Sequence, residues 1–442
     1  MKIKNYFIQL VLILFALSFF NVAAQEFTLK ESINLGLKNS KDLLIARSKV
    51  VGAEEKINEF GSQMLPQLKF NASYARLSDV VPFQIITPFT TTPIKIADPV
   101  LNNYQLKLSL QQPLFTGFRL SSLKSAAENN FEAANFEYES SINDYALKIQ
   151  EAFWNFYNAQ RITELVGKQL TSLNNNVADT KNFLDNGLVS LNDLLKLQVQ
   201  QSNTELKLIE AKNSLDLARM NFNRVIGIAL SSDTKIITPD IDSELISYNP
   251  GEIITEAKAN RNELKALNKK VAATDEGITS ATSTWFPNIY LFGDIYYANP
   301  NQRIQPAMDQ FDDTWNVGLS LNWDLWDWGL TSSKSTQAEQ LKIQTEASLA
   351  QLIEAIEIEV YQAYLNYNKS KDIIIVSQKA VEQAEENYRI TKEKYDVQLA
   401  TSSELVDANV YLLQAQTTLT NSLVDFELAK VKLEKAIGRR IY

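Results

Sequence analysis

The chain has 442 residues, of which 45% are hydrophobic, and its formal net charge of −9 argues against nucleic acid or an anionic membrane surface as a partner. Cysteine and histidine are both absent. Disulfides are therefore excluded, and a metal site or catalytic centre would have to be built without its commonest side chains. We accordingly expect no cofactor and no enzymatic activity.

The first residues are typical of a secretory signal peptide. Lys2 and Lys4 precede a mostly apolar run over 7–20, and the small residues Val22-Ala23-Ala24 suit a cleavage site. We predict a signal peptide over 1–24 and export of the remaining chain. A lipid anchor is not expected, because no cysteine is available to carry one.

A helix and a pair of strands are predicted next. Thr28 and Glu31 form a capping-box pattern that begins a single helix, and Pro66 ends it. Apolar and polar residues then alternate over 68–76 and again over 104–115, which predicts two strands. The connection between them is rich in proline and threonine and is interpreted as a loop.

Each predicted strand has one polar and one apolar face. The polar face carries Lys69, Gln105 and Lys107. Such alternation fits the half-buried sheet of a soluble protein as well as a membrane strand. Because the other face is uninterrupted leucine and aromatic residues, we favour a lipid-facing sheet. The predicted lipid-facing residues are Leu68, Phe70, Tyr74, Leu106, Leu108, Leu110 and, further on, Val317, Leu319 and Leu321.

A very long helical hairpin is predicted over 118–226. No proline occurs between Pro113 and Pro239, so the helix that begins at residue 118 could reach about 100 Å at 1.5 Å per residue. Asn186-Gly187 interrupts it and predicts the turn from which a second helix returns. The segment 231–251 is interpreted as a linker.

The same order of elements then occurs a second time. Residues 114–227 align with 325–438 at a constant shift of 211, and the first strand aligns with its counterpart at a shift of 221. Five of the six tryptophans lie at or near the strands of the second half, as in an interfacial aromatic girdle. The predicted units are a first repeat over 25–230 and a second repeat over 252–442, with strands 288–297 and 314–326 and a helical hairpin over 329–438.

Four strands per chain cannot close into a barrel. Open strand edges are not tolerated in hydrocarbon, so other copies must complete the sheet. Two copies would give eight strands and an interior filled by side chains, whereas three copies give twelve strands and begin to leave a lumen. The polar inward face favours three.

The chain resembles the TolC-type outer-membrane efflux proteins over nearly all of its mature length. The resemblance rests on Leu65-Pro66-Gln67-Leu68 before a strand, Gln112–Gly117 after one, the tip Asn186–Ser190, and their copies in the second half. It implies a membrane α+β fold, in which a trimeric twelve-stranded barrel in the outer membrane continues into a twelve-helix periplasmic tunnel. It also implies a passive exit duct of a tripartite efflux or type I secretion system.

The resemblance implies partners and a gate as well. A periplasmic adaptor and an inner-membrane transporter of the RND, ABC or MFS type would open the duct at its periplasmic tips. The implied gate residues are Glu404, Asp407, Asp193, Asn192 and Tyr395, and the implied docking residues are Asn186, Gly187, Leu188, Val397, Gln398 and Leu399. Glu404 also completes a T-x-x-E capping box, so a purely structural role is equally open for it.

Three positions depart from the family pattern, of which Ser40, where the family often has proline, affects only a helix start. Ala400 stands where the family has a gate arginine, so we predict a gate held by Tyr395 and Asp193, with a simply packed Tyr395 as the alternative. Gln398 stands where the first tip has Gly187. Because glutamine adopts a positive φ less readily than glycine, we expect the two tips to differ in shape.

Two other classes of protein stay open. A periplasmic coiled-coil adaptor or interaction protein without an integral barrel is the main alternative. An enzyme that uses the pair Asp312-Asp313 is a remote one. The transported substrate and the class of transporter cannot be inferred, because a water-filled duct selects weakly.

Overall fold

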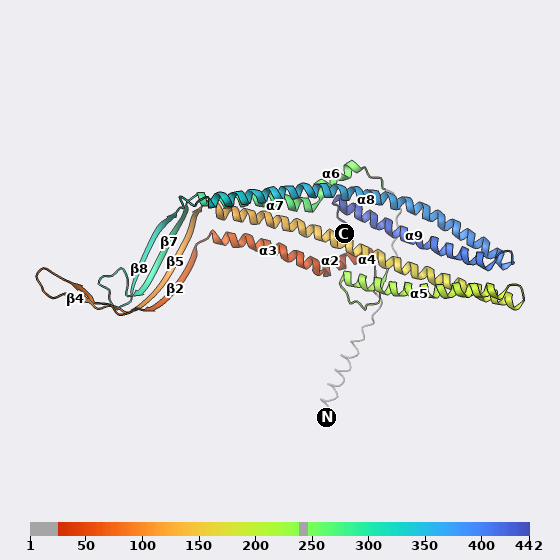
Figure 1. The fold of residues 1–442 in the computed structure, drawn as a ribbon, viewed down its shortest axis with the longest axis horizontal. Coiled ribbons are helices and arrows are strands. Elements are labelled where there is room, and N and C mark those ends of the chain that lie inside the picture. The colour runs from red at the N-terminus through yellow and green to blue at the C-terminus, as the bar shows by residue number, and fades with distance from the viewer. Residues whose placement is uncertain (1–24, 238–245) are drawn as a thin grey trace, which may run out of the picture. The chain divides into compact units, whose positions relative to one another are not determined.

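The computed structural model describes residues 25–237 and 246–442, shown as ribbons in Figure 1. The predicted signal peptide and part of the predicted linker lie outside these residues. The chain divides into two compact units. A helical unit comprises residues up to 46 together with 138–262 and 352–442, and a sheet unit comprises 47–137 and 263–351.

A four-stranded antiparallel sheet is the centre of the sheet unit. Its strand order is β2-β5-β7-β8, so the two repeats meet where β5 pairs with β7. Figure 1 shows the four strands side by side. The strands are β2 (Gln67–Arg76), β5 (Asn102–Thr116), β7 (Asn288–Asn299) and β8 (Asp312–Asn322).

The β8 strand ends at Asn322, although the alternation predicted it as far as residue 326. Its partner strand β7 begins at Asn288, which pairs with Asn322, so no β7 residue remains to pair with the chain beyond Asn322. A tight turn follows, in which Trp328 and Gly329 both have positive φ values. The first repeat makes the corresponding turn with Gly117 and Phe118, again with two positive φ values. Because β5 stays extended as far as Thr116, directly before its own turn, the shorter β8 reflects where its partner strand begins, which alternation within one strand cannot reveal.

The connection between β2 and β5 is not the simple loop that its prolines suggested. It contains a small antiparallel hairpin of β3 (Phe83–Ile85) and β4 (Ile94–Ala97). Four prolines lie in or beside this segment, but none lies within either strand. This hairpin is called the outer hairpin below.

The first predicted helix is two helices. The α2 helix (Leu29–Asn39) ends at Ser40, whose ψ of 121° is extended, and α3 (Lys41–Gln63) begins directly after it. The Ser40 hydroxyl accepts a hydrogen bond from the Leu43 amide at 3.1 Å and so caps α3. The second repeat has the same break between α6 (Pro250–Asn260) and α7 (Asn262–Thr282), followed by the short 3-10 helix η1 (Ser283–Trp285).

Two helical hairpins account for most of the chain. In the first repeat α4 (Arg119–Asp185) has 67 residues and α5 (Leu191–Ile226) has 36. In the second repeat α8 (Leu330–Asp396) and α9 (Ser402–Ile437) have the same two lengths. The duplication read from the sequence is therefore also a duplication of helix lengths.

The helical unit has a packed core where these helices meet. Ile149, Phe153, Phe222 and Ile226 are each fully buried and belong to one cluster. The Tyr145 hydroxyl donates to the Val225 carbonyl at 2.8 Å beside this cluster. The four-and-three spacing of apolar residues along α4 places them on one face, and burial of that face holds α4 and α5 together.

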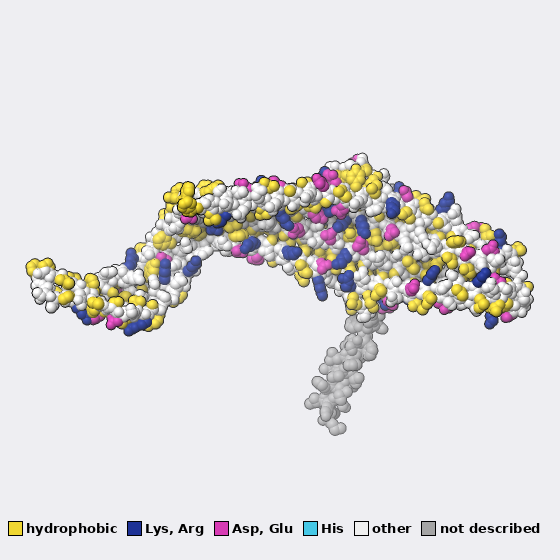
Figure 2. All heavy atoms as spheres, viewed as in Figure 1, with side chains coloured by type: hydrophobic (Ala, Val, Ile, Leu, Met, Phe, Trp, Pro, Cys, Tyr) yellow, Lys and Arg dark blue, Asp and Glu magenta, His cyan; other side chains and the backbone are white. Residues whose placement is uncertain are grey.

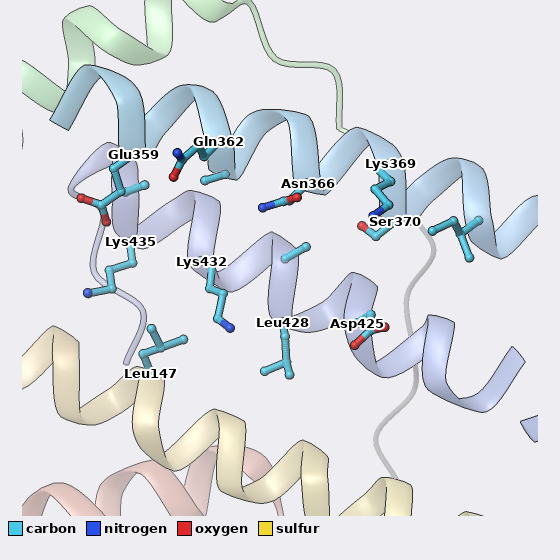
Figure 3. A pocket seen from close by; sticks show the side chains of 14 residues that line it. Leu147, Glu359, Gln362, Asn366, Lys369, Ser370, Asp425, Leu428, Lys432 and Lys435 are labelled. Carbon is cyan, nitrogen blue, oxygen red and sulfur yellow. The ribbon is translucent and has the colours of Figure 1, made fainter. Parts of the chain in front are cut away.

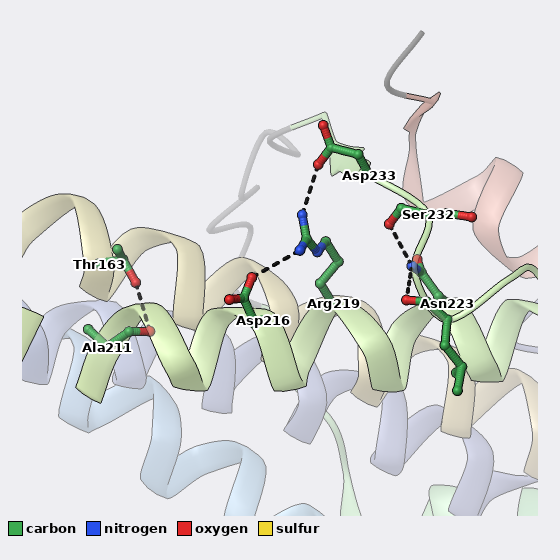
Figure 4. Close-up of polar contacts among 8 residues, drawn as sticks. Thr163, Ala211, Asp216, Arg219, Asn223, Ser232 and Asp233 are labelled. Atoms are coloured by element: carbon green, nitrogen blue, oxygen red, sulfur yellow. Dashed lines mark hydrogen bonds and ion pairs between the residues drawn. The ribbon is translucent and has the colours of Figure 1, made fainter. Parts of the chain in front are cut away.

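The segment predicted as a linker is partly ordered against α5. The β6 strand (Thr234–Ile236) pairs in parallel with β1 (Gln25–Phe27), which the sequence did not predict. Figure 4 shows how polar side chains of α5 hold this segment. Arg219 bridges Asp216 at 3.0 Å and Asp233 at 2.8 Å, and the Asn223 amide donates to the Ser232 carbonyl at 2.9 Å.

Candidate functional site

The first helical tip is a tight turn between α4 and α5. Gly187 has a φ of +71°, and its amide donates to the Leu184 carbonyl at 2.8 Å. The Leu188 amide reaches back to the Phe183 carbonyl at 2.9 Å. This pattern of hydrogen bonds after a left-handed residue satisfies carbonyls that the end of α4 would otherwise leave free.

The second tip has the same geometry, which corrects the expectation that the two tips differ. Gln398 adopts a φ of +65°, its amide donates to the Tyr395 carbonyl at 2.9 Å, and the Leu399 amide donates to the Lys394 carbonyl at 2.7 Å. A left-handed conformation costs a residue with a side chain roughly 1–2 kcal/mol. Because four carbonyl and amide groups are paired by this turn, the second tip keeps the shape despite that cost.

The contact predicted between Tyr395 and Asp193 is wrong in this structure. Only 2% of Tyr395 is exposed, and its hydroxyl is hydrogen-bonded to Thr180 at 2.6 Å. Its ring packs in a cluster with Leu173, Leu197 and Leu405. The packed-aromatic alternative therefore describes Tyr395 better, and the sequence missed Thr180 because it lies more than two hundred residues away.

Asp193 and Glu404 both act as helix caps. Asp193 accepts from the Ser190 hydroxyl at 2.6 Å, and Glu404 accepts from the Thr401 amide at 2.7 Å and its hydroxyl at 3.0 Å. The Ser190 hydroxyl lowers the pKa of Asp193, and the Thr401 amide lowers the pKa of Glu404. Each carboxylate therefore stabilises its tip fully at a pH above the ordinary pKa of that carboxyl group. This stabilisation is lost as the pH falls through the lowered pKa of the folded protein.

Asp407 lies in an open groove between α5 and α9. The groove has a volume of about 380 Å³ and is lined by Asn192, Leu195, Lys196, Val199, Ser403 and Asp407 among others. Lys196, which the sequence analysis did not single out, donates to the Ser403 hydroxyl at 3.0 Å. Asp407 and Asn192, both predicted at the gate, thus share one groove, whereas Glu404 and Asp193 are used in caps.

A second cavity lies further along α8 and α9, and Figure 3 shows it with its lining side chains. Its volume is about 500 Å³. Lys432 and Lys435 line it on α9, but each is already paired with an acid of α4, Lys432 with Glu151 at 2.8 Å and Lys435 with Asp144 at 2.6 Å. This cavity therefore offers no unpaired charge from those lysines to an anionic ligand.

The polar face of the sheet carries a charged cluster. The Lys107 ammonium lies 3.2 Å from the Asp294 carboxylate and 5.1 Å from the centre of the Tyr296 ring. The Tyr296 hydroxyl donates to the same carboxylate at 3.2 Å. The charged groups on the predicted polar face are therefore paired with one another. Asp294 and Tyr296 belong to β7, whose polar face the sequence had not indicated.

The other face of the sheet is apolar and exposed. Phe70, Val317 and Leu319 have 67%, 65% and 68% of their surface exposed within the chain. All nine residues predicted to face lipid are among the exposed large hydrophobic residues of the chain. A water-soluble monomer rarely leaves so much contiguous apolar surface uncovered.

Aromatic side chains border this apolar face at both ends. At the end that carries the outer hairpin, Tyr74, Tyr104, Tyr297 and Phe311 form a chain of ring contacts with centroids 4.8–5.6 Å apart. At the other end lie Trp285, Trp323, Trp326 and Trp328, and the Trp323 indole donates to the Trp285 carbonyl at 3.2 Å. Figure 2 shows hydrophobic side chains gathered toward both ends of the sheet.

Residues 25–237 and 246–442 contain no helix long and apolar enough to cross a membrane and no cluster of acidic side chains suited to a metal ion. Asp312 and Asp313 are the first residues of β8. Neighbouring strand residues point to opposite faces, so these two carboxylates do not form a catalytic pair.

Comparison with known proteins identifies similar sequences over most of the chain. Residues 32–227 and 253–439 match the family model described as outer membrane efflux protein. Outer membrane protein TolC of Vibrio cholerae serotype O1 is 22% identical over 93% of this chain and 90% of its own length. Alkaline protease secretion protein AprF of Pseudomonas aeruginosa is 21% identical over 92% of this chain and 85% of its own length.

Solved structures share the fold. The outer membrane protein VceC of Vibrio cholerae superposes with a TM-score of 0.77 at 20% identity, covering 94% of this chain and 97% of VceC. The CmeC outer membrane channel of Campylobacter jejuni gives a TM-score of 0.77 at 17% identity, covering 93% and 85%. Both repeats, including their strands and helical hairpins, are therefore matched in sequence and in fold.

Proposed function

Because the chain belongs to the outer membrane efflux protein family and acts in the outer membrane as an exit duct for efflux or type I secretion, we propose that three copies form the duct. Their sheets would join into one twelve-stranded barrel, and their helical hairpins into a twelve-helix periplasmic tunnel. The observation that carries this proposal is a sheet with one exposed apolar face, aromatic borders and two unpaired edges. The alternative of an adaptor without an integral barrel has no comparable support.

The dimensions of the apolar face fit a bilayer. On β5 the aromatic borders are Tyr104 and Phe115, eleven residues apart. A strand rises about 3.4 Å per residue, and barrel strands tilt by about 35–45°, so the borders would be roughly 25–30 Å apart along the membrane normal. The apolar band of outer-membrane barrels is about 25 Å tall.

The unpaired edges require neighbours in such an environment. Within the described residues, β2 and β8 are each paired on one side only. In hydrocarbon each unsatisfied backbone group costs several kcal/mol, so an open edge along most of a strand would be prohibitive. Pairing of β8 with β2 of the next copy satisfies both edges and closes the ring after three chains.

The helices of the helical unit support association as well. Along α5 a row of apolar side chains stays 49–65% exposed within the chain, namely Leu191, Leu195, Val199, Leu206 and Ile209. This spacing of four, four, seven and three residues follows one side of a helix. Burial of this row against a neighbouring copy would contribute hydrophobic stabilisation that the single chain forgoes.

We further propose that the two tips form the periplasmic entrance. An adaptor would dock on the exposed tip residues Gly187, Leu188, Gln398 and Leu399, and an inner-membrane transporter would supply the energy. The matching hydrogen-bond pattern of the two tips supports equivalent docking at both. The duct itself would catalyse no reaction, and transported compounds would be chosen by the transporter.

The trimer is tested by mass. Protein extracted from outer membranes in detergent should have, after subtraction of bound detergent, three times the mass of the processed chain, which is somewhat below the 50.0 kDa calculated for all 442 residues. Multi-angle light scattering measures this mass directly. Recovery of the protein in the soluble periplasmic fraction, or a monomeric particle, would contradict the proposal.

We also propose that Asp407 and Glu404 gather into an acidic ring at the entrance. Three copies would bring six carboxylates together, and mutual repulsion would be relieved by bound cations. The variant Glu404→Ala/Asp407→Ala should lose inhibition by divalent cations and gain single-channel conductance by about twofold or more. The variant Glu404→Gln/Asp407→Asn removes the charges but keeps the side-chain size, so it distinguishes an effect of charge from an effect of the width of the entrance. Unchanged cation sensitivity in both variants would refute the ring.

A further inference from the structure

The outer hairpin, taken here with the residues that join it to β2, exposes a run of large apolar side chains. From Val80 to Ile94 it contains no charged residue. Eight of its large apolar side chains are 42–94% exposed, namely Val80, Val81, Phe83, Ile85, Ile86, Phe89, Ile94 and Ile96. Figure 2 shows hydrophobic side chains at its free end, which Figure 1 marks by the label β4.

The hairpin lies beyond the end of the apolar sheet face. It begins at Leu77, directly after β2, and the aromatic border of Tyr74, Tyr104 and Phe311 lies between it and the lipid-facing leucines. Aromatic borders of membrane barrels sit at the level of the lipid headgroups. The hairpin therefore extends past the hydrocarbon layer, where lipid tails do not cover its side chains.

The hairpin is long enough to reach the centre of the barrel mouth. Twelve strands spaced about 4.8 Å apart and tilted by about 40° form a ring with a radius of about 12 Å. The thirteen residues from Leu77 to Phe89 can span up to about 40 Å when extended. Three hairpins that start on this ring can thus meet on its axis.

We propose that the three outer hairpins of the assembled channel pack against one another on the threefold axis and cover its outer mouth. The proposal rests on the trimer proposed above. Identical apolar loops held about 20 Å apart on one ring have a high effective concentration for each other, so their mutual burial needs no further partner. The channel would then have an apolar cover at the outer mouth in addition to the periplasmic tips.

The composition of the hairpin disfavours other occupants. An anionic glycolipid surface would attract lysine or arginine, yet the only lysine beside the apolar run, Lys95, is paired with Asp98. To reach the hydrocarbon layer, the hairpin would have to fold back over the aromatic border. The hairpins of the other two copies are the nearest apolar surfaces.

Disulfide crosslinking tests the proposal cleanly because the natural chain contains no cysteine. The Phe89→Cys variant places one thiol at a side chain that is 94% exposed, so folding of the chain should be unaffected. On mild oxidation in dilute detergent, three thiols on the axis can form one disulfide per trimer, and about two-thirds of the chains should run as dimers on a denaturing gel. The control is Met308→Cys, which lies on the β7–β8 connection near the outward-facing Phe311 and should stay monomeric.

The outcomes separate the two proposals. Light scattering of each variant before oxidation reports the trimer, and a monomeric particle would refute the proposed assembly itself. A trimer in which Phe89→Cys crosslinks no better than Met308→Cys would overturn the hairpin proposal alone.

A second measurement asks whether the mouth is covered. Ser73→Cys places a thiol on the polar face of β2, where a membrane-impermeant maleimide added outside intact cells can reach it only through the outer mouth. Adding Phe89→Lys puts three like charges on the axis and should accelerate labelling about tenfold, whereas Met308→Lys should not. Equal labelling rates in all three backgrounds would overturn the proposal.

Discussion

Leu319→Arg is expected to prevent assembly of the protein in the outer membrane. Leu319 lies in β8, opposite Leu291 on the exposed apolar face and midway between Trp315 and Trp323 along the chain. An arginine facing lipid near the middle of a barrel costs about 2–4 kcal/mol per chain, hence about 6–12 kcal/mol in a trimer. That sum is comparable with the whole stability of many proteins. The amount of trimer in purified outer membranes, measured by immunoblot, should fall at least tenfold.

Ser320→Arg is the matched control for this prediction. Ser320 is the next residue of the same strand, and its side chain lies on the polar face with Lys107 and Asp294. A charge there would be solvated by the lumen of the proposed barrel, so near-normal amounts of trimer are expected. Similar losses in both variants would show that β8 merely tolerates no arginine, and normal assembly of Leu319→Arg would exclude a lipid-facing position.

Gly117→Ala is expected to destabilise the sheet unit by about 2–5 kcal/mol. Gly117 has a φ of +61°, and an added Cβ atom would lie 2.3 Å from the Ser283 carbonyl oxygen. The left-handed conformation costs alanine about 1–2 kcal/mol, and forcing an atom into a filled space costs about 1–3 kcal/mol more. Urea unfolding followed by tryptophan fluorescence measures the loss, because five of the six tryptophans lie in the sheet unit.

Gly329→Ala separates the two costs. Gly329 belongs to the corresponding turn of the second repeat and has a φ of +81°, but an added Cβ atom would meet nothing within 4 Å. Only the conformational cost of about 1–2 kcal/mol is expected there. If both variants lost the same free energy of unfolding, the close approach of Gly117 to η1 would add nothing to the cost of the substitution.

Most of the regular structure could be predicted because its signals are periodic and local. Alternation identified the four strands, and the lack of proline identified the helical hairpins. The pairing of β1 with β6 escaped because each strand has only three residues, too few for any period, and their partners lie about two hundred residues apart. The break at Ser40 escaped because serine is tolerated within helices, and only its extended ψ reveals the boundary.

The tips illustrate where local reasoning about a site stops. The capping role of Glu404 could be inferred, because Thr401 lies three residues before it and the geometry of a first turn is fixed. The partner of Tyr395 could not, because Thr180 comes from another helix and depends on how α4 and α8 pack. The prediction for Gln398 was wrong because it relied on the low preference of glutamine for a positive φ. The hydrogen bonds of the turn determine its shape instead.

The pairing of β5 with β7 also provides a template for the contact that we propose between copies. By the internal repeat, β8 corresponds to β5, and β2 of the next copy corresponds to β7. The pairs Leu108 with Ile295 and Ser109 with Asp294 then translate into Leu319 with Tyr74 and Ser320 with Ser73. Apolar residues meet apolar ones and polar residues meet polar ones, as a correct register requires.

The same translation also indicates where the contact ends. The pair Tyr104 with Asn299 becomes Trp315 with Ser78, and Ser78 lies past the end of β2 at Arg76. At that position the Trp315 carbonyl already accepts a hydrogen bond from Arg303 at 2.9 Å. The β5–β7 pairing inside one chain therefore prescribes, residue by residue, the junction expected between copies, and the proposed trimer would be a ring of six nearly equivalent strand pairs.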